Sequence, residues 1–173
     1  MADFTAQVFQ NEYLAEDSTD AHAVVSVSGS GAGGAGEQGA AAEILIIDAS
    51  GSMDMPSAKI AAARRAGAVA LQEIVDGTWF AVIAGRTEPE MVYPPHFQLA
   101  QMNAETRAAA QAAVSALKPR GAAALGWWIS AATKLFEQVP GAQCHALLLT
   151  DGRQEGEAPA ALAMRLALAK ARA

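Results

Sequence analysis

The spacing of apolar residues changes along the chain and predicts an N-terminal β hairpin. Residues 4–8 alternate between apolar and polar side chains, and a second run rich in β-branched residues covers 24–28. Both patterns are typical of strands. The polar run 17–20 between them predicts a turn, so we expect residues 1–28 to form a hairpin. Two strands do not form a stable domain alone, so we expect the hairpin to pair with further strands or with a second copy of the chain.

A Gly-rich linker over residues 29–42 separates the hairpin from a region with a different pattern. From Glu43 onward, unbroken apolar runs predict strands buried on both faces, and helical spacing separates them. Strands are predicted over 44–47, 78–83, 91–93 and 144–149, and helices over 57–75, 104–117, 124–138 and 158–172. Alternating strands and helices indicate an α/β fold, so we expect residues 43–173 to form a doubly wound, mostly parallel sheet.

Composition narrows the class of protein further. The chain has 173 residues, 52% of them hydrophobic, which is enough for a core, and its net charge of −6 argues against a nucleic-acid partner. The single cysteine, Cys144, excludes an internal disulfide and is expected to be a small buried residue in its strand. No apolar run is long enough to span a bilayer, and no secretory signal is visible. We therefore expect a cytoplasmic domain with no membrane partner.

Two predicted strands lead into loops that carry an aspartate near hydroxyl or glycine residues. Asp48 is followed by Ser50 and Ser52, and Asp151 lies between Thr150 and a glycine. Ligands of open α/β sheets bind beyond the carboxyl ends of the strands, so we expect these side chains to meet there. Carboxylate and hydroxyl oxygens suit Mg²⁺ or Mn²⁺ and, less specifically, Ca²⁺. Asp48, Ser50, Ser52 and Asp151 are therefore the candidate metal ligands, and Thr150 is expected to support the loop.

These segments carry a resemblance to a known family. Residues 47–53 (IDASGSM), 59–63 (KIAAA) and 149–152 (LTDG) resemble the von Willebrand factor type A domain and its metal-ion-dependent adhesion site. The resemblance implies a Rossmann-like fold in which the two serines bind the cation directly and the two aspartates bind it directly or through water. It also implies a non-enzymatic interaction module, in which the carboxylate of a protein partner completes the metal's coordination shell. Bacterial members of the family serve in chelatase complexes, stress and tellurium-resistance clusters and surface adhesion, and this sequence favours none of these.

The sequence departs from the family pattern in two places. Ala123 stands where the family has a threonine ligand, and a methyl group does not coordinate a metal, so we expect weaker cation binding. The alternative interpretation is a degenerate site in a metal-independent scaffold or assembly domain. The family sheet also has one more strand and helix than residues 43–173 provide. We therefore expect either a longer protein or a sheet that is completed in another way.

Other patterns in the sequence do not favour a nucleotide cofactor or catalysis. Residues 29–34 fit the Gly-x-Gly-x-x-Gly pattern of dinucleotide-binding loops, but the segment before Glu43 is too short for a crossover helix, so we expect no nucleotide cofactor. Ser50 lacks the frame of a hydrolase nucleophile, and we expect no catalytic residues. Only one of the two neighbouring tryptophans 127–128 is expected to face the core. Glu155 and Glu157 are expected to be solvated charges.

Overall fold

The computed structural model describes residues 3–10, 23–30, 40–153 and 156–170, which fall in two units, 1–38 and 39–173. In the first unit, β1 (Asp3–Gln10) pairs antiparallel with β2 (Ala23–Ser30). The two predicted strands of the hairpin are therefore confirmed. Its predicted turn and most of the linker lie outside the described residues. Residues 29–30 belong to β2 and not to the linker, because the strand pairing continues to Ser30 opposite Asp3.

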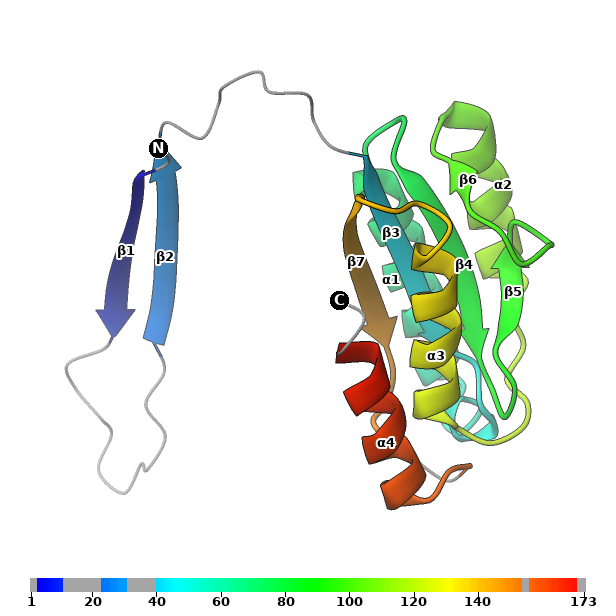
Figure 1. Cartoon of the computed structure of the whole chain (residues 1–173). Coiled ribbons are helices and arrows are strands. Elements are labelled where there is room, and N and C mark those ends of the chain that lie inside the picture. Colours follow the sequence, from blue (N-terminus) through cyan, green and yellow to red (C-terminus); the bar gives the residue numbers. More distant parts are fainter. Residues whose placement is uncertain (1–2, 11–22, 31–39, 154–155, 171–173) are drawn as a thin grey trace, which may run out of the picture. The chain divides into compact units, whose positions relative to one another are not determined.

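The second unit contains the predicted α/β sheet (Figure 1). Its five strands are β3 (Ala41–Asp48), β4 (Trp79–Gly85), β5 (Glu90–Tyr93), β6 (Ala100–Gln101) and β7 (Gln143–Leu149). The order is β5-β4-β3-β7, and β6 also pairs with β4. The pairs β3–β4 and β3–β7 are parallel, whereas β5 and β6 run antiparallel to β4. The mostly parallel sheet is thus confirmed, although the two-residue strand β6 was not predicted.

Helices cover both faces of this sheet, as expected for a doubly wound fold. Helices α1 (Ala58–Glu73) and α2 (Ala104–Ser115) lie on one face, and α3 (Leu125–Phe136) and α4 (Pro159–Lys170) lie on the other (Figure 1). A 3₁₀ turn, η1 (Gly51–Met53), follows β3. Asn103 caps helix α2: its side chain accepts a hydrogen bond from the backbone N–H of Thr106 at 2.9 Å. The Thr106 hydroxyl accepts one from Asn103 N in return, so both polar groups are paired.

The central strands β3 and β4 are buried on both faces and form two apolar clusters. Leu45 and Ile47 belong to the cluster under α1 and α2, whereas Ile44 and Ile46 belong to the cluster under α3. Trp128 fills the second cluster at 1% exposure, while Trp127 is 47% exposed, as the helical spacing predicted. The alternation of side chains along β3 therefore links the two halves of the core through one strand.

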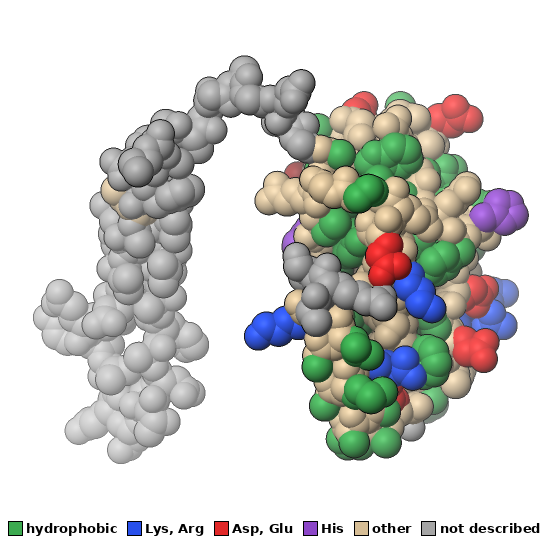
Figure 2. Space-filling view, in the orientation of Figure 1, with side chains coloured by type: hydrophobic (Ala, Val, Ile, Leu, Met, Phe, Trp, Pro, Cys, Tyr) green, Lys and Arg blue, Asp and Glu red, His purple; other side chains and the backbone are tan. Residues whose placement is uncertain are grey.

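The edge strand β7 differs from its prediction. Residues 143–147 are exposed, so the expectation that Cys144 is buried is wrong. The reason is its position: β7 pairs with β3 on one side, and within the described residues no strand pairs with its other side. Helix α4 has no buried residue, and hydrophobic side chains lie exposed over it (Figure 2). No helix within the described ranges is both long and apolar enough to cross a membrane.

Candidate metal-binding site

The site lies where two neighbouring parallel strands end. In the β3–β7 pair, Ile47 lies opposite Leu149, so Asp48 and Thr150 leave the sheet at the same end. From β3 the chain passes first to β4 on one side and later to β7 on the other, so the strand order reverses at β3. This is the position at which open α/β sheets bind their ligands.

Asp48 connects the two loops that form this end of the sheet. Its side chain is fully buried. Its Oδ1 accepts hydrogen bonds from the backbone N–H of Ser50 at 2.9 Å and from the Ser50 hydroxyl at 2.7 Å. Its Oδ2 accepts a hydrogen bond of 2.8 Å from the hydroxyl of Thr150. Thr150 therefore supports the loop, as expected, because its hydroxyl also accepts a hydrogen bond from Gly152 N at 3.0 Å.

The serine pair continues this network towards Asp151. The Oγ atoms of Ser50 and Ser52 lie 3.1 Å apart, and the Ser52 hydroxyl donates to Oδ1 of Asp151 over 3.4 Å. The predicted meeting of the four side chains is thus observed, although residues 52 and 151 are 99 positions apart. Whether the four side chains bind a metal stays a prediction.

The oxygen atoms present fit a small divalent cation. Neighbouring ligands of an octahedral Mg²⁺, each at about 2.1 Å from the ion, lie about 3.0 Å apart, close to the Ser50–Ser52 spacing of 3.1 Å. Each serine hydroxyl donates its proton to a carboxylate and keeps its lone pairs for a cation. Among the described residues, no group of three or more His, Cys, Asp or Glu side chains could hold a metal. A cation here would therefore depend on the serines as much as on the two aspartates.

The loop that carries Ala123 packs against this site. Gly51 N donates to the carbonyl oxygen of Gly121 at 2.7 Å, and Arg120 N donates to that of Ala49 at 2.8 Å. Ala123 itself is 2% exposed and belongs to the apolar cluster under α3. The loop that contacts the site therefore carries the departure from the family pattern. A buried methyl group stands there at the position of the family's threonine ligand.

Ion pairs hold the same loop from the side of β5. Arg120 lies 2.5 Å from a carboxylate oxygen of Glu90, which also pairs with Arg86. Burial raises the pKa of Glu90, but the hydrogen bonds and charges of the two arginines outweigh it and hold that pKa below its ordinary value. The Thr87 hydroxyl accepts a hydrogen bond of 2.9 Å from the backbone N–H of Ala122. The loop is thus held at several points along its length.

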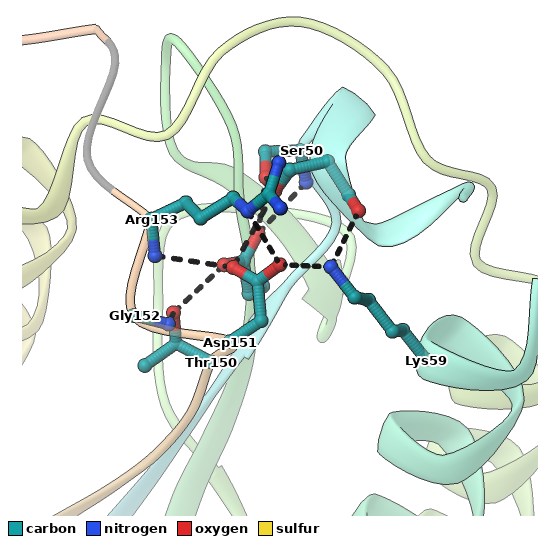
Figure 3. A network of polar contacts seen from close by, with 8 residues as sticks. Ser50, Lys59, Thr150, Asp151, Gly152 and Arg153 are labelled. Carbon is teal, nitrogen blue, oxygen red and sulfur yellow. Dashed lines mark hydrogen bonds and ion pairs between the residues drawn. The ribbon is translucent and has the colours of Figure 1, made fainter. Parts of the chain in front are cut away.

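Lys59 is the residue that sequence reasoning missed. It lies in the first turn of α1, and its Nζ donates to Oδ2 of Asp151 at 2.7 Å and to the carbonyl oxygen of Ser52 at 3.3 Å (Figure 3). The hydrogen bond from Lys59 is the largest cause that lowers the pKa of Asp151, and the backbone N–H of Arg153 contributes at 3.2 Å. A lysine seven residues after the second serine was the available signal, but the sequence does not show that it reaches a residue 92 positions away.

Glu157 corrects another expectation, because it is not a solvated charge. Its side chain is 3% exposed and accepts a hydrogen bond of 2.8 Å from Gly126 N in the first turn of α3. Its other oxygen pairs with Arg165 of α4 at 2.8 Å, and the Arg165 guanidinium lies 3.6 Å from the centre of the Trp127 ring. A carboxylate at a helix N-terminus satisfies free backbone N–H groups there, which explains its burial. Glu155 lies outside the described residues.

The fold and the loops at its switch point define an α/β domain with a polar, oxygen-rich rim. The family model of the von Willebrand factor type A domain matches residues 44–154, and the chain belongs to this family. A solved structure named "von Willebrand factor type A from Catenulispora acidiphila" is 41% identical with a TM-score of 0.74; the match covers 95% of this chain and 37% of that chain. The chain thus spans little more than a third of that solved protein.

More distant structures share the fold. The vWF domain of the type V pili tip protein Mfa5 from Porphyromonas gingivalis is 17% identical with a TM-score of 0.56, covering 68% of this chain and 39% of that one. Proximal thread matrix protein 1 from the mussel byssus is also 17% identical, with a TM-score of 0.60, covering 76% and 35%. A comparison with curated proteins found no match.

Proposed function

We propose that this domain is a protein-interaction module that binds Mg²⁺ or Mn²⁺ at Asp48, Ser50, Ser52 and Asp151. The observation that carries the proposal is the meeting of four oxygen-bearing side chains from two loops, with the serine Oγ atoms 3.1 Å apart. A cation with few charged ligands keeps part of its positive charge, and when bound it would attract the carboxylate of a partner. The interaction would therefore depend on the cation.

The chain's own residues have separate roles in this proposal. Buried Asp48 holds the loops after β3 and β7 together, since both of its oxygens accept hydrogen bonds from them. The serine hydroxyls are the direct ligands, because their protons are already donated to carboxylates. Asp151 is less buried than Asp48, with 13% of its side chain exposed, and lies nearer the surface that a partner would reach.

The names of the structural neighbours agree with an interaction role. One is a pili tip protein and another is a thread matrix protein, and both names describe components of assembled structures. His145 lies on the exposed edge strand, paired with Glu43, and not in the network of the four candidate residues. We therefore propose a non-enzymatic role for this chain.

A second candidate is a scaffold or assembly domain with a site that has lost its metal. The observation in its favour is the ion pair of Lys59 with Asp151, which already supplies a positive charge inside the network. Ala123, which has no hydroxyl to coordinate a metal, also favours this second candidate. In this case the partner would bind with or without a divalent ion.

Thermal unfolding with added Mn²⁺ separates the two candidates. Binding to the folded state alone stabilises it by about 2.7 kcal/mol at a free concentration of about 100 times Kd. We expect Mn²⁺ to raise the Tm of the wild-type chain and of Ser115→Ala, an exposed serine at the end of α2, but not of Ser50→Ala. An unchanged wild-type Tm at millimolar Mn²⁺, with no binding by titration calorimetry, would reject the metal site and favour the scaffold.

A further inference from the structure

We propose that Lys59 is an internal cation that competes with a divalent ion at this site and weakens its binding. The inference rests on the proposed metal-binding function and concerns how that site is regulated. Its basis is the position of one ammonium group: Lys59 Nζ contacts two of the four candidate residues, Asp151 through Oδ2 and Ser52 through its carbonyl oxygen (Figure 3).

Lys59 is the main positive charge in the network of the site. The charged side chains in its network are Asp48, Asp151, Lys59 and Arg153. Lys59 is the nearer cation, at 2.7 Å from Asp151 and with 26% of its side chain exposed, whereas Arg153 lies 4.0 Å away and is 62% exposed. Partial burial reduces solvent screening, so the lysine charge acts strongly on its surroundings.

The site holds two carboxylates, so neutralising one of them removes a large part of its negative charge. Metal affinity rises with the number of charged ligands, and Lys59 neutralises one of the two carboxylates. A divalent ion beside Asp151 must bind against a positive charge a few ångströms away, or displace it. Lys59 therefore provides a counter-charge that keeps the network together without a metal, and it lowers the affinity for one.

The alternative role for Lys59 is to orient Asp151 for a metal, and the contacts argue against it. Lys59 binds Oδ2, whereas Oδ1 is the oxygen that faces Ser52. Oδ1 also accepts a hydrogen bond of 3.2 Å from the backbone N–H of Arg153. Asp151 therefore keeps an anchor when the lysine is removed, and loss of the charge is the larger effect.

Titration calorimetry with Mn²⁺ on the full chain tests this inference. The variants are Lys59→Met, which removes the charge and the hydrogen bond, and Lys59→Gln, which keeps a donor without the charge. Lys134→Met is the matched control, because it makes the same change in net charge at an exposed position on α3. We expect both Lys59 variants to bind Mn²⁺ at least about tenfold more tightly than wild type, since a unit charge about 6 Å from a divalent ion has about this effect even at the dielectric constant of water. Lys134→Met should bind like wild type.

Several outcomes would overturn the inference. Equal Mn²⁺ affinities of the wild-type chain and both Lys59 variants would overturn the inference, while the metal site itself would remain supported. Weaker binding by Lys59→Met, together with wild-type binding by Lys59→Gln, assigns Lys59 the positioning role and also overturns it. Absence of binding by wild type and by both folded variants rejects the metal site itself. The inference is supported if Lys59→Gln binds Mn²⁺ more tightly than wild type and the double variant Lys59→Gln/Ser50→Ala loses that binding. If Lys59→Met does not fold, the affinity of Lys59→Gln alone tests the inference.

Discussion

The hydroxyl of Thr150 donates a 2.8 Å hydrogen bond to Oδ2 of Asp48, a residue 102 positions earlier in the chain. This bond joins the loops after β3 and β7, and its acceptor is fully buried. Because a buried carboxylate depends on its hydrogen-bond donors, the pair links the stability of the domain to the geometry of its candidate site. The same bond explains why a residue with a hydroxyl group suits the position directly after β7.

Thr150→Val should destabilise the domain by about 1–3 kcal/mol, because it leaves a carboxylate oxygen of Asp48 without its donor. Urea unfolding followed by tryptophan fluorescence measures the change. Thr133→Val is the control, since the hydroxyl of Thr133 donates its hydrogen bond to the carbonyl oxygen of Ile129 within its own helix, α3. Thr150→Ser should recover most of the loss. Equal stabilities of Thr150→Val and Thr133→Val would contradict the role given to this bond.

Stability should also depend on pH through Asp151. The hydrogen bond from Lys59 holds the pKa of Asp151 below the ordinary value of 3.8. A carboxyl group with a lower pKa in the folded state stabilises the fold above the unfolded value, and this contribution is lost as pH falls through the folded value. Below about pH 4, wild type should therefore lose stability more steeply than Asp151→Asn.

Urea midpoints measured from pH 6 down to pH 3 test this prediction. Asp54→Asn, at an exposed position in the loop after β3, is the control and should follow the wild-type curve. Glu90 also has a lowered pKa, so the difference between variants, and not the wild-type curve alone, reports on Asp151. Parallel curves for wild type and Asp151→Asn would show that the Lys59 ion pair contributes nothing to acid sensitivity.

Restoring the missing hydroxyl should strengthen metal binding at a cost in stability. Ala123→Thr adds a hydroxyl ligand in the loop that contacts Gly51. We expect about tenfold tighter Mn²⁺ binding, which is the lower end of the change in metal affinity caused by single groups around a metal. Ala123 is buried, so the added atoms should destabilise the fold by about 1–3 kcal/mol. Ala123→Val has nearly the shape of threonine without the hydroxyl and isolates its effect. Equal Mn²⁺ affinities of the two variants would mean that this position does not face the cation.

Self-association through the N-terminal hairpin is a separate prediction. A hairpin of two eight-residue strands is at best marginally stable without further partners. We therefore expect the full chain to form dimers or larger species, with a mass in light scattering that rises with concentration. Hydrogen exchange provides the second measurement. A monodisperse monomer whose hairpin amides are fully protected would contradict the prediction, because no second copy would then be needed.

Much of the fold was predictable because each of its signals is local. Unbroken apolar runs identified β3, β4 and β7, and helical spacing identified the four helices within a few residues. The limits of β3 were set too short, since pairing with β4 and β7 extends it to residues 41–48. The strand β6 was missed because two residues carry no periodic pattern, and its existence depends on pairing with β4.

The errors at single residues have a common cause. Cys144 lies in an apolar run but is exposed, because β7 is an edge strand, and Glu157 lies in a polar loop but is buried, because it pairs with Gly126 and Arg165. Exposure depends on which elements are neighbours, and a single strand does not reveal its place in a sheet.

By itself, the sequence determined that Asp48 and Asp151 lie where two apolar strands end and that serines follow the first aspartate. Parallel strands of a doubly wound sheet end at one edge, so the fold class placed both aspartates at that edge. Only the tertiary structure decided that Thr150 supports Asp48, that Lys59 pairs with Asp151, and that Ala123 is buried beside the site. These contacts join residues on separate elements, and their geometry depends on how helices and loops pack, which spacing along the chain does not specify.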